Sequence, residues 1–242
     1  MDILLLRFDA PLMSFGAVMV DQHGPTDRFP GLSMLAGLFG NALGLRHGDA
    51  HALEALQNRI EYAARWDIEP KELLDYHTVD LGQAKMSEPG WTTRGEPEHR
   101  TGGAAAAQGI HQRYRHYWAN GVMTLAVGLR GEGAEPSATT LAERLRQPAR
   151  PLFLGRKTCL PSAPLLLGRA DAPDVVAALR TAPVARRPGH VPATRMAACW
   201  PLGFGEIGPG RRVPVYDRRD WRNQVHAGRR QRYEGWLEVG TP

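Results

Sequence analysis

Two short segments of the chain combine positive side chains with glycine-containing turns. The first, PTDRFPGLSMLAGLFGNALGL at 25–45, places an arginine in a proline turn directly before a helix rich in small residues. The second, FLGRKTC at 153–159, places a glycine beside two cations. Turns of this type present backbone N–H groups together with fixed positive charges, and the two together bind phosphate. The candidate contacts to a phosphate chain are Arg28, Ser33, Leu154, Gly155, Arg156 and Lys157.

Aromatic residues in two further segments are candidates for stacking on nucleobases. DYHTV at 75–79 holds a Tyr-His pair, and HQRYRHYW at 111–118 interleaves cations with rings. Single-stranded RNA is commonly bound by stacking of unpaired bases on rings and by neutralisation of phosphates. A surface loop with a chance aromatic cluster is the alternative for the second segment. The candidate residues are Tyr76, His77, Arg113, Tyr114 and Arg115, with Phe15 near the N-terminus as a further ring.

The charge of the chain indicates an anionic partner. The 242 residues carry a net charge of +5, and all but three of the 30 cations are arginine. The planar guanidinium group of arginine binds phosphate bidentately and stacks on bases. Eleven arginines and three carboxylates lie between residues 181 and 232. This bias predicts either a basic binding surface or a solvated Arg-rich tail.

Other classes of function have little support in the sequence. No apolar run is long enough for a membrane span, and no signal-peptide pattern is present, so we expect a cytoplasmic protein. Cys159 and Cys199 fit no zinc pattern. Neither a Walker A loop nor a GxSxG motif occurs. We therefore expect no metal, no cofactor and no catalytic residue.

Hydrophobic periodicity predicts an α+β fold. Consecutive apolar residues at 3–6 indicate a buried strand, and apolar residues alternate with polar ones over 60–66 in a second strand. The expected elements are strands at 2–8, 60–67 and 122–129 and helices at 33–43, 49–60 and 137–146, with Ser33 as the N-cap of the first helix. This order fits most of a ferredoxin-like (RRM-type) βαββαβ unit.

The predicted unit is interrupted by an insertion at 71–118, between its second and third strands. A connection of this length inside a compact fold is usually functional or disordered. We expect residues 1–180 to form the ferredoxin-like domain that carries this insertion. The Arg-rich region at 181–242 is expected to pack on that domain.

Three of these segments, in this order, resemble the CasD subunit family of type I-E CRISPR Cascade complexes, a branch of the RAMP superfamily. They are GPTDRFPGLSMLAGLFGNALG, DYHTV and FLGRKTC, and the resemblance covers roughly residues 1–168. PLMSFG at 11–16 is similar to the family's PMQAWG, although Met13 and Phe15 replace Gln and Trp. The polar contact of the family at position 13 is therefore not expected here, whereas a ring at position 15 is kept.

The resemblance implies a ferredoxin-like domain with a projecting thumb, which would be the insertion at 71–118. It implies a non-catalytic subunit that holds the 5′ handle of the CRISPR RNA and caps the filament of backbone subunits. It also implies contact with the large PAM-reading subunit and, via the complex, with target DNA in antiviral defence. Sequence specificity towards DNA then comes from guide pairing.

Two other functions remain open from the residues. One is a metal-independent endoribonuclease that processes repeat RNA, as in the type I-C relative of the family. Its acid and base would come from Tyr76, His77 and Lys85 or from His111, Tyr114 and His116. The other is a generic single-stranded nucleic-acid-binding protein, which explains the charge but not the three ordered motifs.

Overall fold

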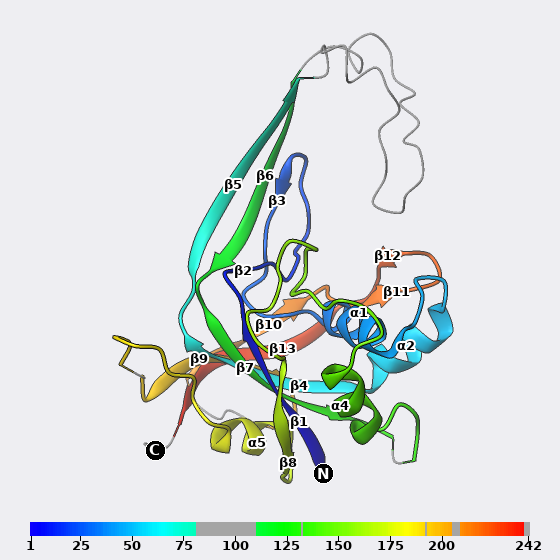
Figure 1. Ribbon diagram of the computed structural model, residues 1–242, viewed down its shortest axis with the longest axis vertical. Helices are drawn as coiled ribbons and strands as arrows, with labels where there is room; N and C mark the ends of the chain where they lie inside the picture. The colour runs from blue at the N-terminus through cyan, green and yellow to red at the C-terminus, as the bar shows by residue number, and fades with distance from the viewer. Residues whose placement is uncertain (81–109, 132, 192, 205–208, 240–242) are drawn as a thin grey trace.

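A seven-stranded antiparallel sheet forms the centre of the computed structural model, which describes residues 1–80, 110–131, 133–191, 193–204 and 209–239 (Figure 1). The order of the strands across the sheet is β10-β13-β9-β4-β7-β1-β8. Their bounds are β1 Asp2–Asp9, β4 Ile60–Ile68, β7 Val122–Leu129, β8 Leu166–Asp171, β9 Arg195–Pro201, β10 Gly210–Val215 and β13 Arg230–Glu238.

Half of the sheet has the predicted βαββαβ order. Two helices, α1 (Leu32–Leu43) and α2 (Ala50–Arg59), connect β1 to β4, and α4 (Ala138–Arg146) connects β7 to β8. The four strands lie side by side as β4-β7-β1-β8, which is the arrangement of a ferredoxin-like unit. The prediction of an α+β fold is confirmed, and the structure places each expected strand and helix within a few residues of its predicted bounds.

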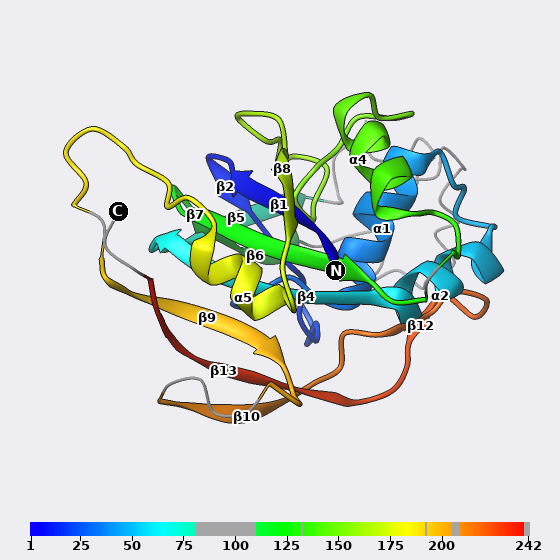
Figure 2. The same ribbon diagram turned by 90° about the horizontal axis from the view of Figure 1, so that it is seen from below.

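Helices cover both faces of the sheet, and this explains the continuous apolar run in β1. Leu4 and Leu6 point to one face, where they pack in a core with α1, α2 and α4. Ile3 and Leu5 point to the other face and pack with α5 (Val175–Thr181) (Figure 2). Side chains alternate between the two faces of a strand, so a strand that is covered on both sides is apolar throughout.

A buried ionic network ties the end of α5 to the sheet. Arg65 on β4 is fully buried, and its Nε donates to Asp67 Oδ1 at 2.7 Å. Its guanidinium group also donates to the carbonyl oxygens of Leu179 and Ala182. Asp67 Oδ2 in turn accepts from Thr124 Oγ1 and from the backbone N–H at position 185, both at 2.7 Å. Every oxygen of the buried carboxylate therefore has a donor.

The Arg-rich C-terminal region extends the same sheet beyond β4 and is not a solvated tail. β9 pairs with β4, β13 with β9 and β10 with β13. Next to the first residue of β10, the Trp236 N–H group donates to the Pro209 carbonyl at 3.1 Å. Arg232 is 1% exposed and forms ion pairs with Asp27 and Glu234 at 2.8 and 2.6 Å. Part of the arginine content of this region therefore serves the fold.

The insertion begins and ends as a projecting β hairpin, which we call the thumb (Figure 1). β5 (Lys71–Asp80) pairs along its whole length with β6 (Ile110–Ala119). Two short strands also pair with β6: β2 (Leu12–Met13) at the end next to the sheet and β3 (His23–Gly24) at the middle of the hairpin. Within the described part of the chain, no helix is long and apolar enough to span a bilayer.

Candidate nucleic-acid interface

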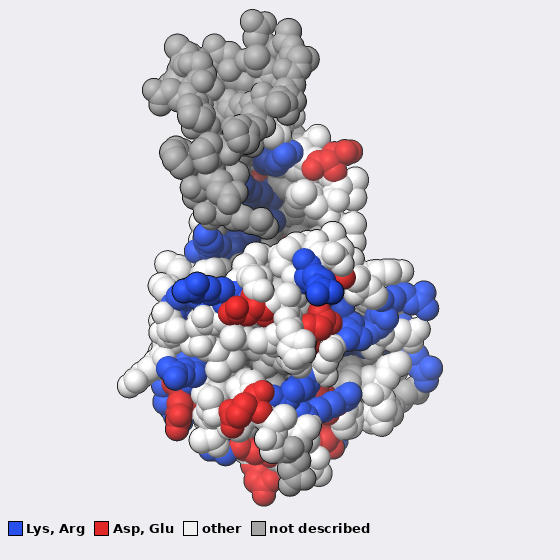
Figure 3. All heavy atoms as spheres, turned by 90° about the vertical axis from the view of Figure 1, so that its right-hand side faces the viewer, with Lys and Arg blue, Asp and Glu red and all other residues white. Residues whose placement is uncertain are grey.

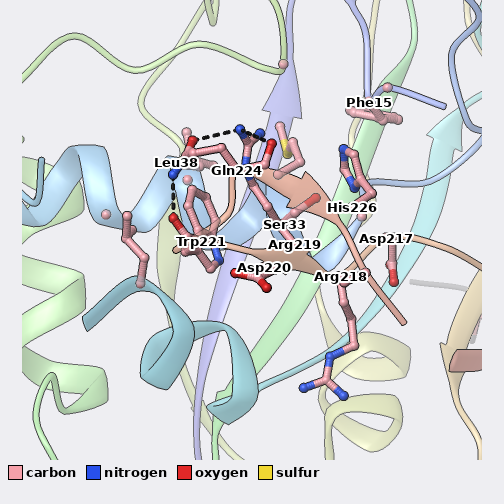
Figure 4. A pocket seen from close by; sticks show the side chains of 18 of the residues that line it. Phe15, Ser33, Leu38, Asp217, Arg218, Arg219, Asp220, Trp221, Gln224 and His226 are labelled. Atoms are coloured by element: carbon pink, nitrogen blue, oxygen red, sulfur yellow. Dashed lines mark hydrogen bonds between the residues drawn. The ribbon is translucent and has the colours of Figure 1, made fainter. Parts of the chain in front are cut away.

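A wide groove of about 2700 Å³ lies between α1 and a hairpin from the C-terminal region. The hairpin, β11 (Arg219–Asp220) and β12 (Val225–His226), is seen beside Ser33 and Leu38 of α1 in Figure 4. The groove lining includes eight Arg and Lys side chains and five Asp and Glu side chains. Figure 3 shows cations spread over the face of the molecule below the thumb, with carboxylates between them.

The N-terminus of α1 is capped by the C-terminal region rather than by Ser33. The N-cap residue is Gly31, and Ser33 lies within the helix. Asp217 Oδ2 accepts from Leu32 N–H at 3.0 Å, and the Asp217 carbonyl accepts from Ser33 N–H at 2.8 Å. The prediction that Ser33 caps the helix is wrong, and its N–H group is already occupied. The Ser33 side chain still lines the groove.

Gly155 packs against the protein's own backbone. Its φ of +98° lies in the left-handed region, and a Cβ there would overlap the Ser14 carbonyl oxygen. Leu154 is fully buried, and its carbonyl accepts from Ser14 N–H at 3.1 Å. The space that a Cβ would take at Gly155 is therefore filled by the protein itself and is not open to an RNA chain. The prediction of an RNA contact from Leu154 is wrong, because its side chain is buried.

The two cations after Gly155 have different environments. Arg156 donates to the carbonyl oxygens of His116 at 2.9 Å and Gly24 at 2.8 Å, and its guanidinium group lies 4.6 Å from the Tyr117 ring centre. These contacts fix the base of the thumb. Lys157 is exposed and lines the groove. Lys157 is thus the member of the pair that is available to a phosphate.

Phe15 borders the groove but is buried in the core, and Arg28 is engaged outside the groove. Phe15 is 5% exposed, and its ring packs against Phe8 and Trp66 at centroid distances of 6.4 and 6.1 Å. Stacking of a base on Phe15 is therefore contradicted, because the ring belongs to the core. The Arg28 side chain forms an ion pair with Glu69 at 2.7 Å and lies outside the groove lining.

The predicted thumb residues divide between two faces of the hairpin. Tyr114 stacks on Tyr76 at 4.8 Å and on His23 at 4.7 Å, so that the three rings form a row across β5, β6 and β3. Arg113 and Arg115 flank Tyr114 on β6 and therefore point to the opposite face. The three stacked rings and the two arginines thus lie on opposite faces of the hairpin.

Each set of groups considered for RNA cleavage contains a histidine that is hydrogen-bonded to a carboxylate of β5. His77 follows Tyr76 on β5, so the two side chains point to opposite faces, and His77 is hydrogen-bonded to Asp75. In the second set, His116 Nδ1 is hydrogen-bonded to Glu72 Oε1 at 2.6 Å. Lys85 lies outside the described residues.

Metal and thiol chemistry have no site in the described residues. No group of three His, Cys, Asp or Glu side chains is arranged there to hold a metal ion. Burial raises the pKa of Cys199 to about 12 and also raises the pKa of Cys159. Both thiols are therefore protonated at neutral pH, and neither is an activated nucleophile.

The groove contains cations that sequence reasoning did not single out. They include Arg46 in the loop between α1 and α2, and Arg218 and Arg222 around β11. The Arg-rich composition of 181–232 was the available signal for the last two. Arg46 carried no such signal. It shares a groove with Arg218 and Arg222 only because the hairpin of β11 and β12 packs against α2.

An α+β sheet with a projecting hairpin and a groove lined by more cations than carboxylates defines a protein with a basic groove. A family model described as "CRISPR-associated protein (Cas_Cas5)" matches residues 3–233. The chain is 31% identical over 188 residues to the "CRISPR system Cascade subunit CasD" of Escherichia coli (strain K12), over 73% of this chain and 75% of the relative.

Solved structures agree with this relationship. One described as "CRISPR RNA-guided surveillance complex" is 25% identical, with a TM-score of 0.68 over 98% of this chain and 90% of that chain. Another, described as "Crystal structure of Cas protein", is 22% identical and shares the fold, with a TM-score of 0.62 over 98% and 94% of the two chains. The protein belongs to the Cas5 family of CRISPR-associated proteins, and the resemblance found in its sequence is confirmed.

Proposed function

We propose that this chain is a non-catalytic subunit of a type I-E Cascade surveillance complex and that it binds the 5′ handle of the CRISPR RNA. The observation that carries the proposal is the basic groove between α1 and the C-terminal hairpin. Family membership and the likeness to a Cascade subunit indicate which anionic chain would occupy it.

The thumb would lie across the RNA in such a complex. Its aromatic face, with Tyr76 half-exposed, would stack on bases, and Arg113 and Arg115 on the other face would contact phosphates. His77 would contact RNA beside these arginines. The chain would cap the backbone-subunit filament and touch the large PAM-reading subunit. Target DNA would be engaged through the assembled complex.

Sequencing of the RNA that copurifies with the protein tests this proposal. We expect a uniform repeat-derived 5′ end on varied spacers when the protein is purified from cells that express a CRISPR array. A heterogeneous pool of cellular RNA would instead support the generic single-strand-binding function. Incubation of the preparation with a repeat transcript tests the non-catalytic part, and cleavage within the repeat in the presence of EDTA would contradict it.

We predict that the Arg156→Ala, Lys157→Ala double variant binds the handle about 1–3 kcal/mol more weakly than the parent chain. The single variants should separate two causes. Lys157→Ala should lower the slope of log K against log salt by about 0.7, because one phosphate contact is lost. Arg156→Ala should also lower the urea midpoint, because two backbone carbonyls lose their donor. Fluorescence titrations at several salt concentrations measure the slope.

The control for this pair is Arg169→Ala, on the edge strand β8. Arg169 is paired with Asp2 and lies outside the groove. Exposed ion pairs contribute little to stability, so both the slope and the urea midpoint should stay close to the parent values. A parent-like handle affinity in the double variant would remove the 153–159 loop from the site.

A further inference from the structure

We infer that the hairpin at 217–228, which we call the C-terminal hairpin, is the second wall of an RNA-binding groove and that buried Gln57 positions it. The inference rests on the proposed function and assigns the Arg-rich region to the RNA itself. Lys157 would contact the phosphate chain from the 153–159 loop. Arg218 and Arg222 would contact it from the C-terminal hairpin, together with Arg46 in the neighbouring loop, whose His47 touches the hairpin.

The C-terminal hairpin is attached to α2 through one buried amide. Gln57 is 1% exposed and lies on the buried side of α2. Its Oε1 accepts from Arg219 N–H at 3.0 Å and from Trp221 Nε1–H at 3.3 Å, while its Nε2 donates to the Arg219 carbonyl at 3.0 Å. The amide therefore pairs with both backbone groups of Arg219, as a neighbouring strand would. A buried polar side chain with this many partners fixes the position of the segment that it binds.

A second attachment holds the start of the C-terminal hairpin at α1. Asp217 caps the helix, and Arg230 Nε and Nη2 donate to its two carboxylate oxygens at 2.8 and 2.6 Å. The contact is close enough that a Cβ at Gly31 would lie 2.8 Å from the Asp217 Cβ. The C-terminal hairpin is therefore fixed at two places, at the N-terminus of α1 through Asp217 and at α2 through Gln57.

The hydrogen bonds of the hairpin turn leave the side chain of Arg222 available to a ligand. Asp220 Oδ1 accepts from the backbone N–H groups of Arg222 and Asn223 at 3.0 and 2.9 Å, and Asn223 Nδ2 donates to Oδ2 at 2.7 Å. These hydrogen bonds, those from Asn223 first, lower the pKa of Asp220. The carboxylate is thus engaged within the turn. Within the described part of the chain, the Arg222 side chain has no ion pair.

The same holds for two further cations of the groove, Arg46 and Lys157. In the ranges that the structure describes, neither Arg46 nor Lys157 forms an ion pair, and both are exposed. Exposed arginine and lysine side chains on facing walls are suited to a flexible chain of phosphates, which each wall can contact in turn. A protein partner would instead need carboxylates that face the cations of both walls.

The experiment is a titration of the full-length chain with a labelled handle RNA and with a scrambled RNA of equal length, at four salt concentrations. For Arg222→Ala we expect about tenfold weaker handle binding and a salt slope lower by about 0.7. Arg211→Ala, on edge strand β10 outside the groove, is the matched control and should bind as the parent does. Unchanged affinity and slope for Arg222→Ala would overturn the inference.

Variants at Gln57 test the positioning role. Gln57→Met removes all three hydrogen bonds, and we expect the salt slope to fall by more than the 0.7 of a single contact, since Arg218 and Arg222 move together. Gln57→Glu keeps the acceptor for Arg219 N–H and Trp221 Nε1–H, so it should recover part of the slope. A Gln57 variant that lowers the urea midpoint but keeps the salt slope of the parent chain would show that Gln57 only stabilises the fold. That result would contradict its role in positioning the C-terminal hairpin.

The outcomes distinguish this inference from the proposed function. If the parent chain binds handle and scrambled RNA equally, the proposed function fails whatever the variants do. If the parent prefers the handle and Arg222→Ala retains that affinity, the proposed function stands. The inference that the C-terminal hairpin is the second wall of the groove is then wrong. Loss of target-DNA or large-subunit binding in Arg222→Ala, with handle binding intact, would assign the C-terminal hairpin to that partner and overturn the inference.

Discussion

Replacing Asp67 with alanine is expected to lower the free energy of unfolding by about 3–5 kcal/mol. The carboxylate is fully buried and accepts from Arg65, from Thr124 and from the backbone at position 185. Its removal leaves the Arg65 guanidinium group charged in the interior with only carbonyl partners. Breaking one side of a buried ion pair costs far more than the net stability of the pair, because the desolvated charge remains.

Urea denaturation followed by tryptophan fluorescence measures this effect. Asp171→Ala is the matched control, since Asp171 pairs with the N-terminal amine at 3.2 Å but its side chain is 95% exposed. That substitution should change stability by less than about 1 kcal/mol. Equal effects of the two substitutions would mean that the network at Asp67 does not hold α5 on the sheet.

Gly155→Ala is expected to cost about 2–5 kcal/mol and to displace the loop that carries Lys157. The φ of +98° is strained for alanine, and its Cβ would overlap the Ser14 carbonyl oxygen, which belongs to backbone and cannot rotate away. Because Leu154 is anchored in the core, the displacement should appear at 155–159. Handle RNA should bind more weakly as Lys157 moves.

Gly203→Ala separates the energetic cost of backbone strain from the cost of the overlap with Ser14. Gly203 has a similar φ of +107°, and a Cβ there would meet nothing within 4 Å. Alanine at this position should cost only the backbone strain of about 1–2 kcal/mol. Amide hydrogen exchange should rise over 155–159 in Gly155→Ala alone. Indistinguishable urea midpoints for the two variants would show that the close approach to Ser14 does not constrain the loop.

The regular elements of the fold could be predicted from the sequence because their signals are local. The apolar run at 3–6 reflects burial on both faces of a sheet, and the alternation over 60–66 reflects one apolar face of a strand. Both strands are observed. The cap of α1 could not be predicted in this way. Asp217 lies 185 residues from Leu32, and no local pattern connects the two.

The candidate site was predicted in part, and the failures have one physical cause. Lys157 does reach the groove, but Phe15 and Leu154 lie in the core, and Arg156 serves backbone carbonyls of the thumb. Side-chain type indicates which chemistry a residue can do, whereas its partners are set by tertiary contacts. The segment at 111–118 is expected to form one mixed surface, whereas strand alternation places Tyr114 on the face opposite to Arg113 and Arg115.

The arrangement of β10 has a consequence for how the molecule can associate. Trp236 N–H bonds to the Pro209 carbonyl, so the backbone groups at 211, 213 and 215 point to β13 and those at 210, 212 and 214 point outward. Position 214 is proline, which has no N–H to offer, and Arg212 adds charge to the same edge. The free edge is thus protected against the addition of a further strand. In a crowded assembly of strand-rich subunits, this edge would disfavour aggregation by the addition of a strand to the sheet. Recognition of a partner at this edge would then depend on side chains.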